Sequence, residues 1–136
     1  FGADALISPN ATSDVVGAIK DLTRGLGADR SLEASSSPAA RAQAVRCLRT
    51  WGQACYVGEG DTVTLDVSND LLRRQISIVG SWTFSSIAQG ECARYIAERG
   101  IDIDRLFTHR WKLEQAEEAY QVFDQQTAGK GVIHPS

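Results

Sequence analysis

Short apolar runs bounded by glycine, proline or serine recur along the chain and predict β-strands. The first run, Ala5 to Ile7, stops at Ser8-Pro9-Asn10, a sequence that favours a turn. Further strands are expected at residues 30–35, 53–57, 76–82 and 106–113, with a short final one at Val132-Ile133.

Between these runs, apolar residues recur at the spacing of a helix face. One helix begins after Ser13 and ends at Gly25-Leu26-Gly27. A second begins at Ser37, with Pro38 at a position where its missing N–H is not needed, and ends at Gly52. A helical turn is expected within residues 65–75, and longer helices at 86–99 and 114–127. The predicted buried faces are Val15, Ile19 and Leu22; Ala40, Ala44, Val45 and Leu48; Ala88, Cys92 and Ile96; and Ala116, Ala119, Tyr120 and Phe123.

Strands that alternate with helices of this length pair in parallel through right-handed crossovers. The sequence therefore predicts an α/β fold, a partial Rossmann-like parallel sheet flanked by helices. Gly58 and Gly80 end two of the strands, so they belong at the carboxyl edge of the sheet, where ligands bind in such folds.

The composition narrows the functional classes. The 136 residues, 43% of them hydrophobic and 23% charged, suit one soluble globular domain. A net charge of -3 gives no basic surface for nucleic acid or for an anionic membrane. No apolar run approaches the roughly 20 residues of a membrane span. The three cysteines, Cys47, Cys55 and Cys92, cannot all pair with one another, so we expect a reduced, cytoplasmic setting.

The usual signatures of catalysis and phosphate binding are absent. Gly25-Leu26-Gly27 has Arg30 where a G-x-G-x-x-G loop needs its third glycine, and Gly58-Glu59-Gly60 has Val63 there, so both are turns. His109 and His134 are the only histidines, and neither has a cysteine or carboxylate at metal-ligand spacing. The residues alone therefore provide no catalytic group and no metal site.

An ordered set of short stretches carries a family resemblance. They are residues 1–4 (Phe-Gly-Ala-Asp), 27–29, 32–35 (Leu-Glu-Ala-Ser), 48–53, 56–58, 80–82, 107–110, 118–120 and 129–133. Together they resemble the medium-chain dehydrogenase/reductase superfamily, specifically its zinc-type alcohol, polyol and threonine dehydrogenases. No single stretch is specific, but the set covers nearly the whole chain in order.

The resemblance implies a division of the chain. Family members have a GroES-like catalytic domain, then a Rossmann cofactor domain, and return to the catalytic domain with the last segment. Residues 1–100 would then be an incomplete NAD(P)-binding Rossmann domain, and residues 101–136 the returning segment. The family's zinc ligands, phosphate loop and ribose-binding acid lie before the position matching Phe1. The abrupt start at Phe1 and the lack of any methionine likewise lead us to expect a fragment.

The resemblance also assigns cofactor contacts. Ala34 and Ser35 match residues beside the nucleoside part of NAD or NADP. Val57, Gly58 and Glu59 match the turn along the nicotinamide ribose. The segment whose backbone hydrogen-bonds the carboxamide is matched by Ser81, Trp82 and Thr83. A basic position that neutralises the pyrophosphate is matched by Lys130. The alternative for each is strand-end packing or, for Lys130, a solvated lysine.

The implied function is hydride transfer between an alcohol or polyol and NAD or NADP, by a homo-oligomeric enzyme of which this chain is a C-terminal, by itself inactive, fragment. In the whole enzyme zinc would polarise the alcohol oxygen. Two alternatives remain open. One is a non-catalytic Rossmann-like module for binding or oligomerisation. The other is a different doubly wound enzyme such as a methyltransferase, against which the ordered stretches argue.

Strand order raises a difficulty. In the Rossmann order 3-2-1-4-5-6 the strand at 5–7 is separated from the strand at 30–35 by two strands that this chain lacks. We expect one of three outcomes: the first strand slides against the second, two chains pair across the gap, or the missing part lies outside this chain. The whole assignment requires that the strand ends near Ser35, Val57 and Trp82 lie along one edge.

Overall fold

The computed structural model describes residues 2–125 and 129–135 and contains two compact units, Phe1–Thr83 and Phe84–Ser136. These units are contact clusters within this chain. The expected division into a cofactor domain of residues 1–100 and a returning segment of residues 101–136 concerns a whole enzyme and stays a prediction.

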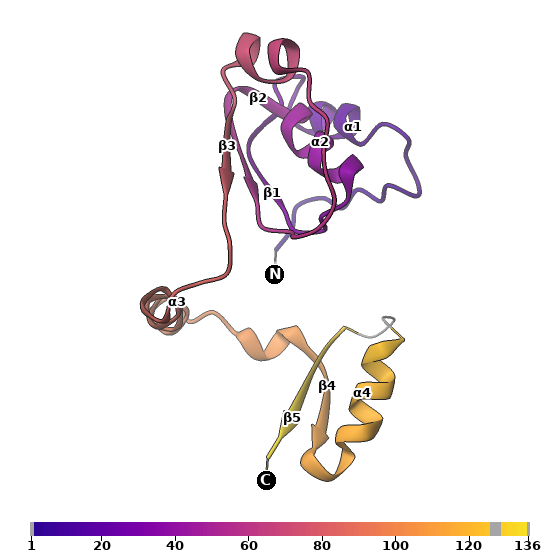
Figure 1. The fold of residues 1–136 in the computed structure, drawn as a ribbon, viewed down its shortest axis with the longest axis vertical. Helices are drawn as coiled ribbons and strands as arrows, with labels where there is room; N and C mark the ends of the chain where they lie inside the picture. The colour runs from indigo at the N-terminus through magenta and orange to yellow at the C-terminus, as the bar shows by residue number, and fades with distance from the viewer. Residues whose placement is uncertain (1, 126–128, 136) are drawn as a thin grey trace. The chain divides into compact units, whose positions relative to one another are not determined.

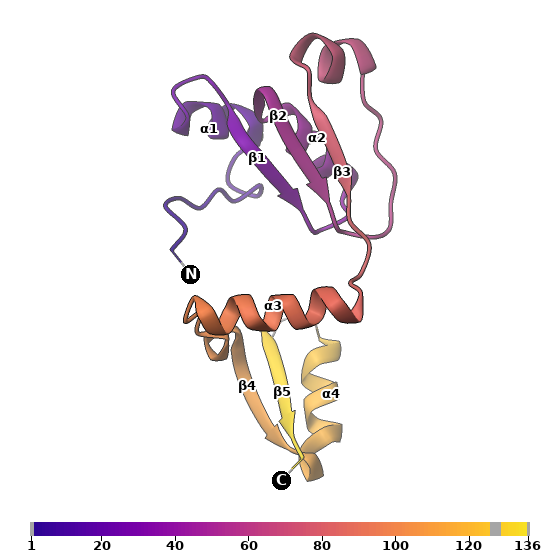
Figure 2. The ribbon, with the colours of Figure 1, turned by 90° about the vertical axis from the view of Figure 1, so that its left-hand side faces the viewer.

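The first unit is a parallel α/β layer. Its elements are α1 (Val15–Leu22), β1 (Ala28–Glu33), α2 (Pro38–Arg46), β2 (Leu48–Tyr56) and β3 (Ser77–Gly80). The strands lie in the order β1-β2-β3, and both pairings are parallel (Figure 2). Helices α1 and α2 lie on the same side of this sheet (Figure 1). The predicted α/β fold with a parallel sheet is confirmed.

A small core joins α2 to β2. Val45, Leu48 and Ala54 are at most 1% exposed and pack together. The link between β2 and β3 forms a π-helical turn (Val67–Leu71) and a 3-10 turn (Leu72–Arg74). The prediction of a helical turn within residues 65–75 is confirmed. Leu65, Leu71 and Ile76 pack against the core from this link.

Several predicted boundaries were wrong by up to six residues, those of β1 and β2 included, which were expected at residues 30–35 and 53–57. Helix α1 is capped by Asp14 and not by Ser13, because the Asp14 carboxylate accepts a hydrogen bond from the backbone N–H of Gly17 at 2.7 Å. Helix α2 ends at Arg46 and not at Gly52. Residues 49–52 instead bulge out of β2, since Ala28 pairs with Leu48 but Arg30 pairs with Gln53.

The strand expected at Ala5 to Ile7 does not form. The outcome in which it slides against the strand at Arg30 is therefore wrong, and β1 has a strand neighbour on one side alone within the described residues. A strand needs a partner for its backbone groups, and the apolar pattern of residues 5–7 cannot supply one.

The second unit holds α3 (Ser86–Glu98), β4 (Phe107–Lys112), α4 (Ala116–Asp124) and β5 (Lys130–His134), with 3-10 turns at Ile103–Leu106 and Leu113–Gln115. Strands β4 and β5 pair in parallel, so α4 is the crossover between them. Each expected element is present. Thr127, the expected end of the last helix, lies outside the described residues.

The buried faces in this unit were predicted less well. Ala119 is buried, but Tyr120 and Phe123 are 73% and 58% exposed. On α3, Ala88 and Cys92 are exposed and Ile96 is half-buried. Helical spacing indicates which side of a helix is apolar, whereas burial also needs a surface to cover that side. Within the described residues, no helix is long and apolar enough to span a membrane.

Candidate functional site

The three parallel strands end side by side. Glu33 pairs with Tyr56, and Tyr56 pairs with Gly80, so the turns that follow them leave the sheet at the same edge. The backbone N–H groups of Val57 and Gly58 both donate to the Glu33 carbonyl, at 2.9 and 3.1 Å. We call residues 34–36, 57–59 and 81–83 the carboxyl rim. The prediction that these strand ends share one edge is confirmed.

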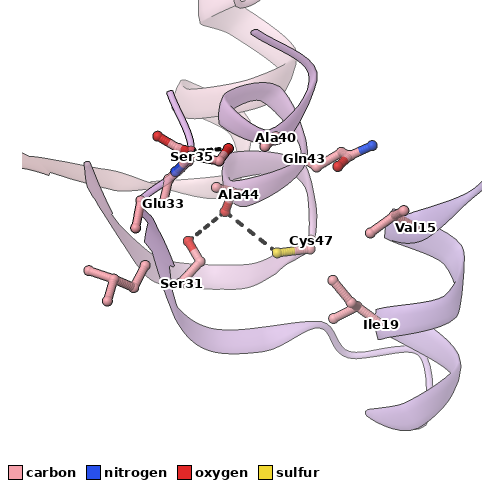
Figure 3. Close-up of a pocket in the computed structure, with 11 residues that line it drawn as sticks. Val15, Ile19, Ser31, Glu33, Ser35, Ala40, Gln43, Ala44 and Cys47 are labelled. Atoms are coloured by element: carbon pink, nitrogen blue, oxygen red, sulfur yellow. Dashed lines mark hydrogen bonds between the residues drawn. The ribbon is translucent and has the colours of Figure 1, made fainter. Parts of the chain in front are cut away.

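The start of the rim borders an open cavity of about 550 Å³ (Figure 3). Its walls come from β1, α1 and α2, and they include Ala34 and Ser35. Most of the lining is apolar, and Val15 and Ile19 of α1 and Cys47, which follows α2, belong to it (Figure 3). An apolar lining of this kind suits a flat, largely apolar ring better than a charged group.

A buried carboxylate holds the first turn of the rim. Glu33 is 3% exposed, and its Oε1 accepts hydrogen bonds from Ser35 N, Ser35 Oγ and Ser36 N at 2.6, 2.7 and 2.8 Å. Burial raises the pKa of this carboxyl, but the hydrogen bonds from Ser35 and Ser36 and the charge of Arg41 outweigh burial, and the pKa of Glu33 lies below its ordinary value. Glu33 is therefore charged inside the protein at neutral pH.

Arg41 holds the second turn. Its guanidinium donates to the carbonyls of Gly58 at 2.7 Å and Gly60 at 3.1 Å, and also to the carbonyl of Asp61. The Tyr56 hydroxyl donates to the Arg41 carbonyl at 2.8 Å, which ties the end of β2 to α2. Three carbonyls from one loop on a single planar cation fix the path of that loop.

Gly58 brings the two turns together. A Cβ at this position would lie 2.5 Å from the Ser36 nitrogen and 3.0 Å from the Ala34 carbonyl carbon. Both neighbours are backbone atoms, which cannot rotate away, so residue 58 has to be glycine for this packing. The close approach of the two turns therefore explains why residue 58 is a glycine without reference to any ligand.

The third part of the rim is open to solvent. Ser81, Trp82 and Thr83 are all exposed, and the Ser81 N–H donates to the Tyr56 carbonyl at 2.9 Å. Val57 and Glu59 are exposed as well. Lys130 belongs to the second unit, where it begins β5 and is exposed.

Sequence reasoning missed Arg41 altogether, and it named Glu33 and Tyr56 only within matching stretches. No local signal in the sequence marked Glu33, because β1 (Ala-Asp-Arg-Ser-Leu-Glu) contains other polar and charged residues as well. The partners of that glutamate come from residues that only the fold brings together.

The described residues provide no metal centre. Among them no group of three or more histidines, cysteines, aspartates or glutamates is placed to hold an ion. His109 stacks on Trp111 at 5.4 Å between ring centroids, and its Nδ1 lies 2.9 Å from Thr108 Oγ1. The His109 ring thus has its partners within its own strand, β4.

The profile of a family described as zinc-binding dehydrogenase matches residues 1–98. The chain belongs to this family. The match agrees with the resemblance to the medium-chain dehydrogenases, and it leaves no support for the methyltransferase alternative.

Individual relatives agree with the family. One relative is an uncharacterized zinc-type alcohol dehydrogenase-like protein of Escherichia coli, YphC. The two sequences are 37% identical over 116 residues, and the match covers 85% of this chain and 33% of YphC. The chain is 31% identical over 141 residues to an L-threonine 3-dehydrogenase of Symbiobacterium thermophilum, which covers 99% of this chain and 39% of the relative. The chain thus spans between a third and two fifths of the length of these relatives.

Two solved structures with alcohol dehydrogenase in their names share the fold. An alcohol dehydrogenase from Thermotoga maritima matches with a TM-score of 0.85 and 26% identity, over 99% of this chain and 38% of that chain. An alcohol dehydrogenase zinc-binding domain protein from Burkholderia ambifaria matches with a TM-score of 0.82 and 29% identity, over 98% of this chain and 36% of that one.

Proposed function

We propose that the chain forms the later part of the cofactor domain, together with the returning segment, of an enzyme that transfers hydride between an alcohol or polyol and NAD or NADP. The observation that carries this proposal is the shared edge of β1, β2 and β3. Ligands of open parallel sheets bind beyond the carboxyl ends of the strands. The relatives named above are dehydrogenases by their names, and the chain matches a part of each.

In this proposal the carboxyl rim receives the cofactor. Ala34 and Ser35 line the open cavity beside the nucleoside, and Val57, Gly58 and Glu59 follow the nicotinamide ribose. The backbone of residues 81–83 hydrogen-bonds the carboxamide, so exposed side chains such as Trp82 can vary without loss of that contact. Lys130 would neutralise the pyrophosphate.

The cofactor supplies the hydride acceptor when it is bound, and this chain supplies its orientation. The rim residues hold no side chain that could take a proton from an alcohol, apart from the exposed Glu59. The described residues include no set of side chains that could hold a zinc ion. Polarising the alcohol oxygen would belong to other parts of a whole enzyme.

Titration of the ¹⁵N-labelled chain with NADH, followed by backbone amide chemical shifts, tests this function. We expect the shift changes to fall on residues 34–36, 57–59 and 81–83. We also expect weak binding, because the described turns include no phosphate-binding G-x-G-x-x-G loop. Changes confined to other residues, or none at millimolar NADH, would contradict the proposal, and a dissociation constant below about 1 μM would contradict the importance of the missing loop.

One observation favours the second function, a non-catalytic module for binding or oligomerisation. Strand β1 has an outer edge without a strand neighbour in the described part of the chain, and Leu32 on it is 69% exposed. Such edges pair readily with other strands. The mass of the chain in solution bears on this function, and on the homo-oligomer that we also propose.

A further inference from the structure

Two buried charges lie between the first two turns of the carboxyl rim. The side chains of Glu33 and Arg41 are 2% and 11% exposed, and Glu33 Oε2 faces Arg41 Nε at 3.6 Å. Neither of these two atoms has a hydrogen-bond partner. The two atoms thus attract each other electrostatically without a hydrogen bond. The other polar atoms of the two side chains bind the turns on either side.

Each ion holds a different turn. Glu33 Oε1 binds the N–H groups of residues 35 and 36, whereas Arg41 binds carbonyls of the loop at residues 58–61. Glu33 belongs to β1 and Arg41 to α2, so both side chains start from regular elements. The Glu33–Arg41 contact is therefore a link through which the spacing between the two turns is set.

We propose that Glu33 and Arg41 are a positioning pair that fixes the 34–36 turn against the 57–59 turn, and that through this backbone geometry they set the affinity of the rim for the nicotinamide cofactor. The inference rests on the proposed function, since it concerns the same site. The pair acts through the backbone of the turns and needs no contact with the cofactor.

The pairing explains why a buried charge is kept where an apolar side chain would also fill space. Removing one partner leaves the other charge buried without compensation, which disturbs the turn that it holds. Binding sites tolerate only small displacements, of the order of half an ångström, before contacts are lost. We therefore expect loss of either charge to weaken NADH binding by about tenfold, which corresponds to about 1.4 kcal/mol.

The chain offers a matched control pair. Arg46 at the other end of α2 binds Asp70 with two hydrogen bonds, at 3.1 and 3.0 Å, and Asp70 is 8% exposed. This pair also joins α2 to a turn, but to the π-helical turn at 67–71 and not to the rim. Its loss should affect folding without moving the rim.

The test compares E33Q and R41K with D70N and R46K. NADH affinity is measured by amide shifts, and the free energy of unfolding by urea denaturation. R41K keeps the charge but has a single ammonium in place of the planar group that reaches three carbonyls. We expect E33Q and R41K to bind NADH about tenfold more weakly and to shift the amides of residues 35, 36 and 58 before NADH is added. D70N and R46K should lose stability and keep the wild-type affinity.

The outcomes separate the two claims. If wild-type amides at the rim do not respond to NADH, the proposed function fails. If the wild type binds at the rim and R41K binds as tightly, the positioning pair is overturned while the proposed function stands. Equal weakening in D70N would likewise overturn it, because the effect would then follow stability. R41K carries the test alone if E33Q does not fold.

Discussion

At the scale of single residues, the backbone of Trp51 adopts a conformation that is unfavourable for a residue with a Cβ atom. Trp51 has a φ of +64°, in the left-handed region, and its side chain is 67% exposed. A residue with a Cβ is disfavoured there by roughly 1–2 kcal/mol. Because the exposed side chain gains little from packing, the bulge in β2 carries this cost without compensation at the same residue.

We predict that W51G stabilises the first unit. Glycine removes the steric penalty of the left-handed conformation, but its greater freedom in the unfolded chain offsets part of this gain. We therefore expect the free energy of unfolding to rise by about 0.5–1 kcal/mol. Urea denaturation measures the change. W82G is the control, since Trp82 is equally exposed at 67% and has no positive φ, so glycine there should not stabilise. A lower unfolding free energy for W51G would contradict the prediction.

At the scale of elements, helix α2 is fastened at both ends by charged side chains. Arg41 near its start binds the loop after β2, and Arg46 at its end binds Asp70. Hydrogen bonds from Arg46 lower the pKa of Asp70, and they outweigh its burial, which alone would raise that pKa. The hydrogen bond from the Asp66 backbone N–H and the charges of Arg46 and Arg74 lower the pKa further. Arg74 also donates to the carbonyls of Val45, Arg46 and Leu48, at the junction of α2 and β2.

The Arg46–Asp70 pair should make stability depend on pH. Folding lowers the pKa of Asp70, so its contribution is present above the unfolded value of about 3.9 and is lost as the pH falls through the folded value. D70N should therefore cost about 1–2 kcal/mol at pH 7, a figure kept small because the Arg46 side chain is 47% exposed. The deficit should shrink in acid.

Urea denaturation of D70N at pH 7 and at pH 3 checks this. D29N is the control, because Asp29 and its partner Arg49 are 78% and 44% exposed and such pairs contribute little. A D70N deficit that grew in acid, or one matched by D29N, would contradict the prediction.

These elements also mark how far the sequence could be read. Apolar spacing located α1, α3 and the strands of both units, because local periodicity follows from local geometry. It failed for Ala5 to Ile7, since an apolar run forms a strand only where a partner lies. It also failed for the Glu33–Arg41 pair. No spacing between residues 33, 41 and 58 indicates that the fold places a carboxylate, a guanidinium and a glycine carbonyl together.

At the scale of the whole molecule, we expect association in solution to depend on the outer edge of β1, which has no strand neighbour among the described residues. Unpaired strand edges seek other strands, and β1 carries the exposed Leu32. We predict a mass above the 14.7 kDa of one chain, measured by light scattering after size exclusion. L32K should reduce the association, because a charge on an edge strand opposes pairing.

L72K is the matched control for this edge. Leu72 is 65% exposed on the 3-10 turn, away from β1, so its replacement should leave the mass unchanged. A wild-type chain that stays monomeric at millimolar concentration would contradict pairing through β1. An equal effect of L72K would assign the association to general hydrophobicity.

The central claim is that the edge shared by β1, β2 and β3 receives a nicotinamide ribose. Nuclear Overhauser contacts between NADH and the chain test it most directly, because they report atoms that lie within about 5 Å of each other. The account predicts contacts from the ribose protons to the methyl groups of Val57. Ribose contacts to residues at the opposite end of the sheet, such as Ala28, would contradict it.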